Sequence, residues 1–149
     1  MLKLNLPPFA INIKKTGGKY YAFDRLRRKF VALTPEEWVR QHFINLLIEH
    51  KGYPESLIAN EIQIELNKQK KRCDSVIYNR ELSPLVIIEY KAPEVNITQD
   101  VFDQIVRYNI VLRVQYLIVS NGLSHYCCKI NYDNQTFEYL KDIPQYSEL

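Results

Sequence analysis

Cysteine is scarce in this sequence, and the spacing of its three cysteines excludes the usual cysteine-based architectures. Cys73 stands alone and Cys127 is followed directly by Cys128, so no C-x-x-C pair is present. An odd number of cysteines without such a pair argues against both a disulfide framework and a structural zinc site. We therefore expect a reducing, intracellular compartment and a cytoplasmic protein.

Long apolar runs are also missing. No stretch approaches the roughly 20 apolar residues that a membrane span requires, and residues 1–8 contain no apolar core of the kind found in signal peptides. Internal repeats and low-complexity segments are absent as well. These absences predict a soluble protein with no membrane association and no targeting segment.

A nucleotide-binding loop is the third missing feature. Residues 16–19 read Thr-Gly-Gly-Lys, but Ile13 stands where such a loop needs its first glycine, and Tyr20 replaces the Ser or Thr that would hold magnesium. A turn between two strands is therefore the better interpretation of this segment. No ATP-driven activity is expected from it.

What the sequence does contain is an ordinary globular composition. It has 149 residues, of which 46% are hydrophobic and 25% charged, and its formal net charge is +3. A chain of this length buries about two-thirds of its unfolded surface. We expect one domain over residues 1–149, with an N-terminal hairpin extension (1–33) and a core (34–140). Because the net charge is small, any binding to nucleic acid must depend on local clusters of cations.

Residues 85–91 begin as a continuous apolar run and end in two charges. The run Leu-Val-Ile-Ile-Glu-Tyr-Lys predicts a central strand covered on both faces, since a half-exposed strand would alternate polar and apolar residues. Glu89 and Lys91 are two residues apart and therefore point to the same face. Burying either group costs several kcal/mol without compensation. An ion pair within the strand is the simplest interpretation of these two residues alone.

Asp74 changes that interpretation. It directly precedes an expected strand at 75–78, and residues 79–84 read as the turn of a hairpin that leads into the central strand. Asp74 is therefore expected to face Glu89 across the hairpin. Two carboxylates that converge repel each other and are normally retained with a cation between them. Oxygen ligands favour a hard ion such as Mg²⁺ or Mn²⁺.

Capping and alternation predict the other elements. Thr34 as N-cap, Pro35 at the first helical position and Glu37 completing a capping box predict a helix that ends before Gly52. A second helix should begin after Thr98 and join two parallel strands, 85–91 and 116–119. Further strands are expected at 11–14, 20–23, 62–66, 125–130 and 135–140, and the tail from residue 144 is expected to fray. In the 125–130 strand, Cys127 and Cys128 would point to opposite faces.

Two groups of cations and one helical stripe are candidates for contact with a substrate. Lys70, Lys71 and Arg72 lie in a polar connection, 67–72, beside the expected carboxylate pair and would suit phosphates, although a solvated loop explains them nearly as well. Residues 25–29 form a second basic cluster that is open to the same two interpretations. On the second helix, Gln104 and Tyr108 are four residues apart and share one stripe. Gln104 could orient a water molecule or a phosphate oxygen, or it could be an amide at the edge of the core.

These features together resemble a known nuclease superfamily. Asp74, then Glu89-Tyr90-Lys91, then Gln104 and Tyr108 are similar to the D, ExK and QxxxY elements of the PD-(D/E)xK nucleases. Segments 33–40, 71–74, 88–93 and 119–122 more narrowly resemble the N-terminal nuclease domain of type I restriction enzyme R subunits, and the resemblance runs from about residue 24 to residue 132. Cys73 stands where the superfamily name has Pro, a position that shapes the backbone and carries no chemistry.

The resemblance implies a fold and a set of roles. The fold would be α/β, a restriction-endonuclease-like mixed sheet with flanking helices and an α-β-β-β-α-β core. Asp74, Glu89 and the backbone carbonyl of Tyr90 would hold one or two Mg²⁺ or Mn²⁺ ions, Lys91 would act on the attacking water or the transition state, and Gln104 would position that water. Glu37 and Tyr108 are further candidates for the site. The partners would be DNA and other restriction-modification subunits, and the chain has no room for the motor of full R subunits.

Two other function classes compete with a nuclease. A nucleic-acid-binding or interaction module could use the same fold with an inactive acidic site, but a pure binder has no need of Asp74 and Glu89, because carboxylates repel phosphate in the absence of a metal. A metal-independent hydrolase that uses the two carboxylates as acid and base is weaker, since no aromatic platform for a sugar accompanies them.

Overall fold

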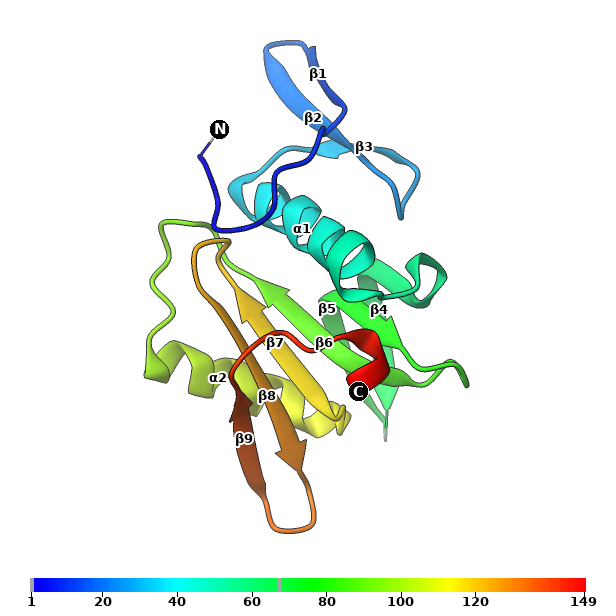
Figure 1. Cartoon of the computed structure of the whole chain (residues 1–149), viewed down its shortest axis with the longest axis vertical. Helices are drawn as coiled ribbons and strands as arrows, with labels where there is room; N and C mark the ends of the chain where they lie inside the picture. Colours follow the sequence, from blue (N-terminus) through cyan, green and yellow to red (C-terminus); the bar gives the residue numbers. More distant parts are fainter. Residues whose placement is uncertain (1, 67) are drawn as a thin grey trace.

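The computed structural model of the chain describes residues 2–66 and 68–149. Two sheets and two main helices make up the described residues (Figure 1). The strands are β1 (Ile13–Thr16), β2 (Lys19–Asp24), β3 (Lys29–Ala32), β4 (Ile58–Leu66), β5 (Gln69–Tyr78), β6 (Pro84–Tyr90), β7 (Tyr116–Ser120), β8 (His125–Asn131) and β9 (Thr136–Leu140). The helices are α1 (Pro35–Asn45) and α2 (Gln99–Asn109). None of the described helices is both long and apolar enough to cross a membrane.

The larger sheet confirms the expected mixed α/β architecture. Its six strands lie in the order β4-β5-β6-β7-β8-β9. Only β6 and β7 pair in parallel, and the chain passes between them through α2, as the βαβ pattern predicts. The other neighbours are antiparallel. The strand expected at 85–91 is thus the third of six, with a partner on each side.

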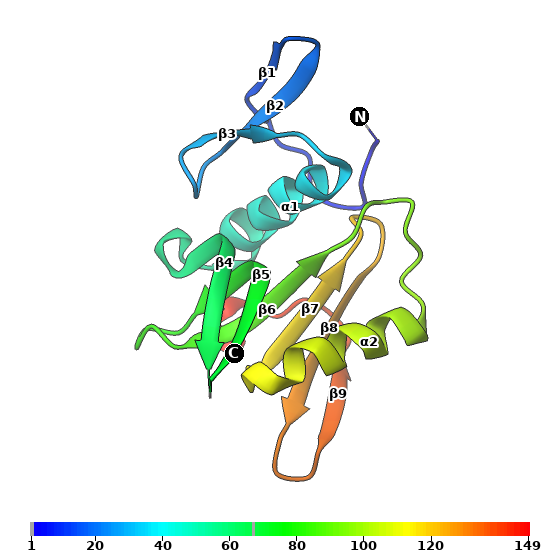
Figure 2. The ribbon, with the colours of Figure 1, turned by 180° about the vertical axis from the view of Figure 1, so that it is seen from behind.

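The core forms two layers, one on each face of this sheet. Val86 and Ile88 of β6 pack with α1, whereas Ile87 faces α2, so the uninterrupted apolar run serves both faces. Figures 1 and 2, drawn from opposite sides, show the two helices covering opposite faces of the sheet. Cys127 belongs to the α1 layer and Cys128 to the α2 layer, which confirms that the adjacent cysteines point to opposite faces.

Helix α1 begins where its capping signals predict. The Thr34 hydroxyl accepts a hydrogen bond from the backbone N–H of Glu37 at 3.1 Å, and Pro35 occupies the first helical position. The helix continues into one π-helical turn, Leu46–His50, and Gly52 follows with a φ of +72°. A positive φ is easily adopted by glycine, so Gly52 allows the chain to leave the helix.

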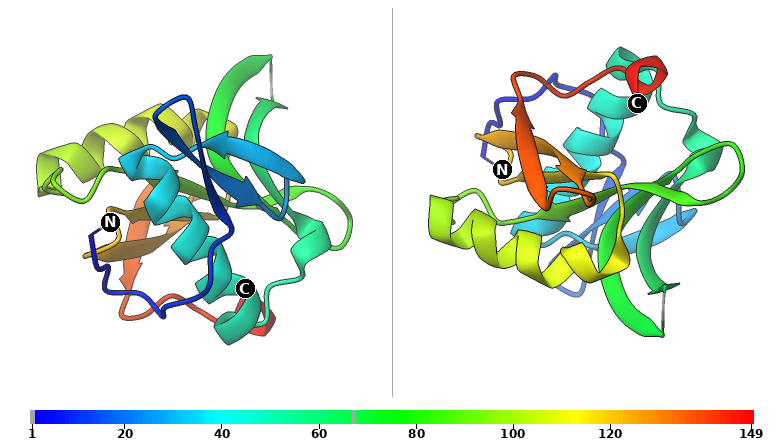
Figure 3. Two further views of the ribbon diagram at one scale, coloured as in Figure 1. Left: turned by 90° about the horizontal axis from the view of Figure 1, so that it is seen from above. Right: turned by 90° about the horizontal axis from the view of Figure 1, so that it is seen from below.

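The N-terminal residues form a sheet of their own. The expected hairpin, β1 with β2, is present, and β3 extends it to a three-stranded antiparallel sheet. This sheet stands at one end of the molecule, above α1 (Figures 1 and 3). The basic cluster at 25–29 follows β2. Two of its arginines form ion pairs: Arg25 pairs with Glu49 and Glu55, and Arg27 pairs with Asp24 and Glu37. The cluster as a whole is therefore neither solvated nor free to contact phosphates.

Three boundaries differ from the sequence-based expectation. Strand β4 begins at Ile58 and not at residue 62. Strand β5 begins at Gln69, so the expected loop over 67–72 is wrong and residues 70–72 are paired with β4; Asn67 itself lies outside the described residues. The tail is not frayed, because the Tyr53 hydroxyl donates to the Pro144 carbonyl at 3.0 Å and the Tyr146 hydroxyl to the Tyr78 carbonyl at 3.0 Å. The two strand differences arise because β4 and β5 pair with each other along a longer hairpin, whereas the tail is held by segments distant in sequence.

Candidate functional site

The carboxylates of Asp74 and Glu89 come from neighbouring antiparallel strands. Ser75 of β5 is opposite Ile88 of β6, and one more step along this register places Asp74 opposite Glu89, as the hairpin predicted. The Asp74 side chain accepts a hydrogen bond from the backbone N–H of Tyr90 at 2.9 Å (Oδ2 to N). This bond holds the Asp74 carboxylate at the end of β6, next to Glu89.

A small cavity of about 190 Å³ opens beside these carboxylates. Asp74 and Glu89 line it together with Tyr108 and Asn109 of α2. Ile87, which precedes Glu89 on the same face of β6, packs in the α2 layer. The site therefore lies at the edge of the apolar layer between the sheet and α2.

Lys91 and Glu89 form the ion pair that their spacing predicts. The ammonium Nζ lies 3.3 Å from Glu89 Oε1, and the two side chains are 34% and 25% exposed. The second oxygen of Glu89 is 3.5 Å from Nδ2 of Asn109, and the same nitrogen donates to the Ile105 carbonyl at 2.9 Å. Both oxygens of Glu89 are thus near a protein donor, one of them a cation that is open to solvent.

The electrostatics of the site favour an added positive charge. Burial raises the pKa of the Asp74 carboxyl, and the negative charges of Glu89 and Glu61 raise it further. The N–H of Tyr90 and the charge of Arg40 act in the opposite direction but do not reverse the shift. An ion with two positive charges beside Asp74 would remove the cost of keeping this carboxylate charged.

A third carboxylate, that of Glu61 in β4, belongs to the strand on the other side of Asp74. Residues on either side of Glu61 in β4 pair with residues on either side of Asp74, so Glu61 lies opposite Asp74. Burial alone would raise the pKa of Glu61, but hydrogen bonds from Arg40 (2.5 Å) and Arg72 (3.2 Å) outweigh it and lower the pKa. Glu61 is therefore already neutralised by protein cations, in contrast to Asp74.

Arg40 of α1 connects these groups from the other side of the sheet. Its side chain is buried, donates to the backbone carbonyl of Asp74 at 3.2 Å and lies over the Tyr90 ring, with the guanidinium 5.5 Å from the ring centroid. It also binds Glu61. Arg40 thus contacts the strands on which both carboxylates are carried.

Glu37 is engaged in a different way from the capping box that the sequence predicts. Its backbone N–H binds the Thr34 cap, but its side chain is buried and accepts from Arg27 at 2.7 Å and from Gln41 at 2.9 Å. Arg40 lies 3.6 Å away. The capping-box role of the side chain was wrong, because two arginines compete for the carboxylate. These contacts account for Glu37 without a metal.

On α2, the structure brings one of the two predicted stripe residues to the site. Tyr108 lines the cavity, and the ammonium of Lys71 lies 3.9 Å from the centroid of its ring. Gln104 is one turn earlier, exposed, and outside the described lining of the cavity. Asn109, which the sequence analysis missed, approaches Glu89 instead. It follows Tyr108 directly, but a lone asparagine near a helix end carries no signal of that contact.

Two of the three candidate cations of β5 border the same cavity. Lys70 is exposed and pairs in register with Glu65 of β4. Arg72 lines the cavity and is bound to Glu61. Lys71 lies over the Tyr108 ring. Arg72 and Lys71 are therefore brought to the rim of the site, although on a strand and with partners of their own, whereas Lys70 lies farther along β5 and outside the described lining.

The donor atoms at the site fit a hard cation. No three histidine, cysteine, aspartate or glutamate side chains among the described residues converge as a complete metal site. Asp74, Glu89 and the Tyr90 carbonyl supply oxygens only, and Mg²⁺ is commonly held by one or two carboxylates with water and phosphate completing its shell. Burial raises the pKa of the neighbouring Cys73 thiol to about 11, so no thiolate competes as a soft ligand.

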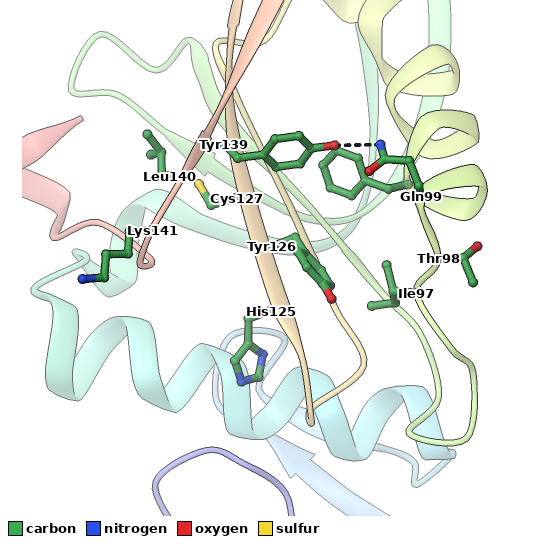
Figure 4. Close-up of a pocket in the computed structure, with 10 residues that line it drawn as sticks. Ile97, Thr98, Gln99, His125, Tyr126, Cys127, Tyr139, Leu140 and Lys141 are labelled. Carbon is green, nitrogen blue, oxygen red and sulfur yellow. Dashed lines mark hydrogen bonds between the residues drawn. The ribbon is translucent and has the colours of Figure 1, made fainter.

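A larger hollow, of about 480 Å³, lies elsewhere, between the start of α2 and strands β8 and β9 (Figure 4). Its wall includes Tyr139, whose hydroxyl accepts a hydrogen bond from Gln99 at 2.9 Å. His125 is held at both ring nitrogens, by Ser120 at 2.7 Å and by the Asn5 carbonyl at 3.0 Å. None of its described lining residues is a carboxylate. The smaller cavity at Asp74 is therefore the better candidate for chemistry.

Comparisons with known proteins identify the family. The family described as type I restriction enzyme R protein N terminus (HSDR_N) matches residues 35–144. Among solved structures, a fragment assigned to the HsdR subunit of a type I restriction enzyme from Vibrio vulnificus YJ016 is similar, with a TM-score of 0.54 and 19% identity. The match covers 78% of this chain and 24% of that chain, and it supports the shared fold. A search of curated proteins found no match.

The family match extends over most of the chain and includes both strands that carry the carboxylate pair. The chain therefore belongs to the family of type I restriction enzyme R protein N-terminal regions.

Proposed function

We propose that the chain is a metal-dependent DNA endonuclease of the PD-(D/E)xK type, an R-subunit-like nuclease domain. The observation that carries the proposal is the meeting of Asp74, Glu89 and Lys91 at the end of β6, beside a cavity open to solvent. Two facing carboxylates and a lysine cost stability at the edge of a core. A metal-dependent reaction explains why all three are together.

The carboxylates would act as ligands. Asp74, Glu89 and the backbone carbonyl of Tyr90 would hold one or two Mg²⁺ or Mn²⁺ ions. When bound, the metal would supply a water of lowered pKa and a positive charge that stabilises the phosphate in the transition state. The Tyr90 N–H would keep the Asp74 carboxylate in place, since it binds only one of its two oxygens.

Lys91 would contribute to the reaction directly. About a third of its side chain is exposed, so its ammonium can contact a phosphate oxygen of a bound strand while it remains near Glu89. A cation in this position stabilises charge that develops on the phosphate or lowers the pKa of the attacking water. Asn109 would hold the second oxygen of Glu89 and so orient the carboxylate.

The remaining candidates would contact DNA. Arg72 lines the cavity and Lys71 lies over the ring of Tyr108. These two residues and Lys70, which is farther along β5, would bind phosphates on either side of the cleaved bond. Gln104 and Tyr108 lie on the helix above it, and Gln104 would reach the water only in the presence of the substrate. DNA is the proposed substrate, and other restriction-modification subunits are proposed as partners because of the family.

One observation favours a second candidate function, an inactive DNA-binding or interaction module. Both oxygens of Glu89 are near protein donors, Lys91 and Asn109, and such a carboxylate must give up part of these contacts to bind a metal. In a module of this kind the charged side chains of Asp74, Glu89 and Lys91 would only stabilise the sheet.

A plasmid-nicking assay separates the two functions. The parent protein, Asp74→Asn and the control Glu65→Gln, which removes an exposed carboxylate from β4, would be incubated with supercoiled plasmid in Mg²⁺ and in Mn²⁺. We expect the parent and the control to nick and Asp74→Asn to lose activity by about a hundredfold or more. Equal nicking by Asp74→Asn would refute the site. A parent that binds DNA and does not nick it with either metal would support the binding module.

A further inference from the structure

The charge of this chain is divided unevenly along its length. Residues 1–33 contain eight lysines and arginines and one acidic residue, a net charge of +7. Residues 34–149 contain twelve cations and sixteen acidic residues, a net charge of −4. The part that carries Asp74 and Glu89 therefore repels a polyanion overall, and the positive charge of the protein resides in its N-terminal part.

The N-terminal sheet has one face toward the body and one toward solvent. On β2, Ala22 and Asp24 are buried, so their common face packs inward. The register pairs Lys14 with Tyr21 and Phe23 with Phe30, and these four residues occupy the opposite face. Figures 1 and 2 show β1 and β2 projecting beyond the rest of the molecule, so this face is accessible from outside.

Most cations of this sheet have no acidic partner. Arg25 and Arg27 are bound to carboxylates and contribute to the fold. Five exposed cations have no carboxylate within salt-bridge distance in the part of the chain that the structure describes: Lys14, Lys15, Lys19, Arg28 and Lys29. Lys14 and Lys15 lie on the edge strand β1, Lys19 begins β2, Arg28 lies in the turn after β2, and Lys29 begins β3. The register places Lys14 and Lys19 on the outer face and Lys15 and Lys29 on the face of Ala22 and Asp24. A solvated surface usually mixes both signs of charge, and this one does not.

The aromatic residues of the sheet hold lysines in place. The ammonium of Lys14 lies 4.2 Å from the centroid of the Phe30 ring, and that of Lys15 lies 5.3 Å from the Tyr20 ring. Phe23 packs edge-on against Phe30, with centroids 5.3 Å apart. Tyr20 and Phe23 nevertheless remain 53% and 38% exposed. The lysines make the surface suited to phosphates, and the single-strand arm of the test below measures whether the exposed rings also bind bases.

The sheet is connected to the candidate site by a chain of buried polar groups. Asn60 of β4 donates to Asp24 at 3.0 Å and accepts from Ser75 of β5 at 2.6 Å. The Tyr90 hydroxyl donates to Ser75 at 3.0 Å, and the backbone N–H of the same tyrosine binds Asp74. Because each group is satisfied by the next, the N-terminal sheet has a defined position relative to the strands that carry the carboxylates.

We propose that the exposed surface of the N-terminal sheet, including both faces of its edge strand β1, is a second DNA-binding surface, which holds the phosphate backbone of a duplex through Lys14, Lys15, Lys19, Arg28 and Lys29. It supplies the attraction that the acidic body lacks and orients the duplex relative to Asp74 and Glu89. The inference depends on the proposed function only in taking DNA as the ligand, because the surface needs neither metal nor cleavage.

Salt-dependent binding tests this surface without any catalysis. The affinity of the full chain for a duplex of about 30 base pairs would be measured in EDTA over a range of salt concentrations. The variant carries Lys14→Gln, Lys15→Gln and Lys19→Gln. The matched control, Lys51→Gln, Lys129→Gln and Lys141→Gln, has the same net charge but loses its lysines from the body. Melting temperatures of both would confirm that they fold.

Counterion release gives the expected size of the effect. Each lost phosphate contact makes the slope of log affinity against log salt concentration shallower by about 0.9. The slope of the triple variant should therefore be shallower than that of the parent by ~2 to ~3, and that of the control by less than ~1. Equal losses in the variant and the control would overturn the proposal, as would the absence of DNA binding by the parent. Tighter binding of single strands than of duplex, reduced by Phe23→Ala, would also overturn it. Binding with this pattern but without nicking would refute only the nuclease.

Discussion

Replacement of Lys91 by alanine separates a catalytic lysine from a structural ion pair. Removing one member of a fully buried ion pair costs about 3 to 5 kcal/mol, because the other charge is left unpaired. The pair in this protein is different, since Lys91 is 34% and Glu89 25% exposed. Water reaches both groups, and Asn109 remains beside Glu89. The expected cost is therefore close to that of a surface pair, about 1 kcal/mol or less.

The same substitution should have a much larger effect on cleavage. A cost of about 1 kcal/mol lowers the melting temperature by roughly 2 to 4 °C in a domain of about this size. Loss of one charge that stabilises the transition state lowers turnover by about a hundredfold or more. The measurements are thermal denaturation and plasmid nicking in Mg²⁺, with Lys129→Ala as control, because Lys129 is exposed on β8 and away from the carboxylates.

Two results would refute this reasoning. If Lys91→Ala melted more than ~10 °C below the parent in the presence of Mg²⁺, the pair with Glu89 would be a structural ion pair of the buried kind. If the variant folded normally and nicked DNA at the parental rate, Lys91 would have no part in the reaction. The control should match the parent in both assays.

Three further predictions concern the metal, the cations of β5 and the buried network. Mg²⁺ or Mn²⁺ at a hundred times its Kd should stabilise the parent by about 2.7 kcal/mol, seen as a higher melting temperature, and should leave Asp74→Asn unchanged; an equal rise in both would contradict the assigned ligands. Alanine at residues 70–72 should weaken binding to all DNA sequences alike and flatten its salt dependence, measured by titration in Ca²⁺; unchanged binding would mean that these cations are only solvated. Asp24→Asn should destabilise by roughly 3 to 5 kcal/mol at pH 7, because Arg27 and Asn60 lose a buried charged partner. The hydrogen bonds from those two residues outweigh burial and lower the pKa of Asp24 in the folded protein. The stability that the Asp24 carboxylate contributes is therefore present above its ordinary pKa of about 3.9 and is lost as the pH falls through the lowered folded value. Denaturant titrations should show the difference in unfolding free energy between parent and variant shrinking below about pH 4, and a difference that stays constant would contradict this assignment.

Several parts of the fold and site were accessible from the sequence because they depend on neighbours along the chain. The central strand follows from its continuous apolar run. Helix α1 begins directly after Thr34, because the hydroxyl of this cap residue can accept the backbone N–H of Glu37. Asp74 and Glu89 face each other because a short turn sets the register of β5 and β6. Alternation along β6 then places Lys91 beside Glu89.

Other parts depend on which distant segments pack together, and local patterns do not contain that information. Glu37 is a plausible capping-box residue by spacing, yet its side chain binds Arg27, because the turn between β2 and β3 lies next to α1. Residues 70–72 look like a loop by composition, and only the observed register shows that the β4–β5 hairpin continues through them, with Glu65 opposite Lys70. The contact of Asn109 with Glu89 depends on how α2 lies across the sheet, which a helical stripe alone leaves open.

The two carboxylates of the site show most clearly which properties follow from local sequence and which require the folded structure. Local spacing is enough to bring Asp74 and Glu89 together, since hairpin register is a short-range property. Their electrostatics depend on Arg40, thirty-four residues before Asp74, and on Glu61 in the next strand, because charge interactions follow distance in space and burial in the core. Only the folded chain therefore decides that Glu61 is neutralised by arginines while Asp74 keeps a raised pKa beside an open cavity.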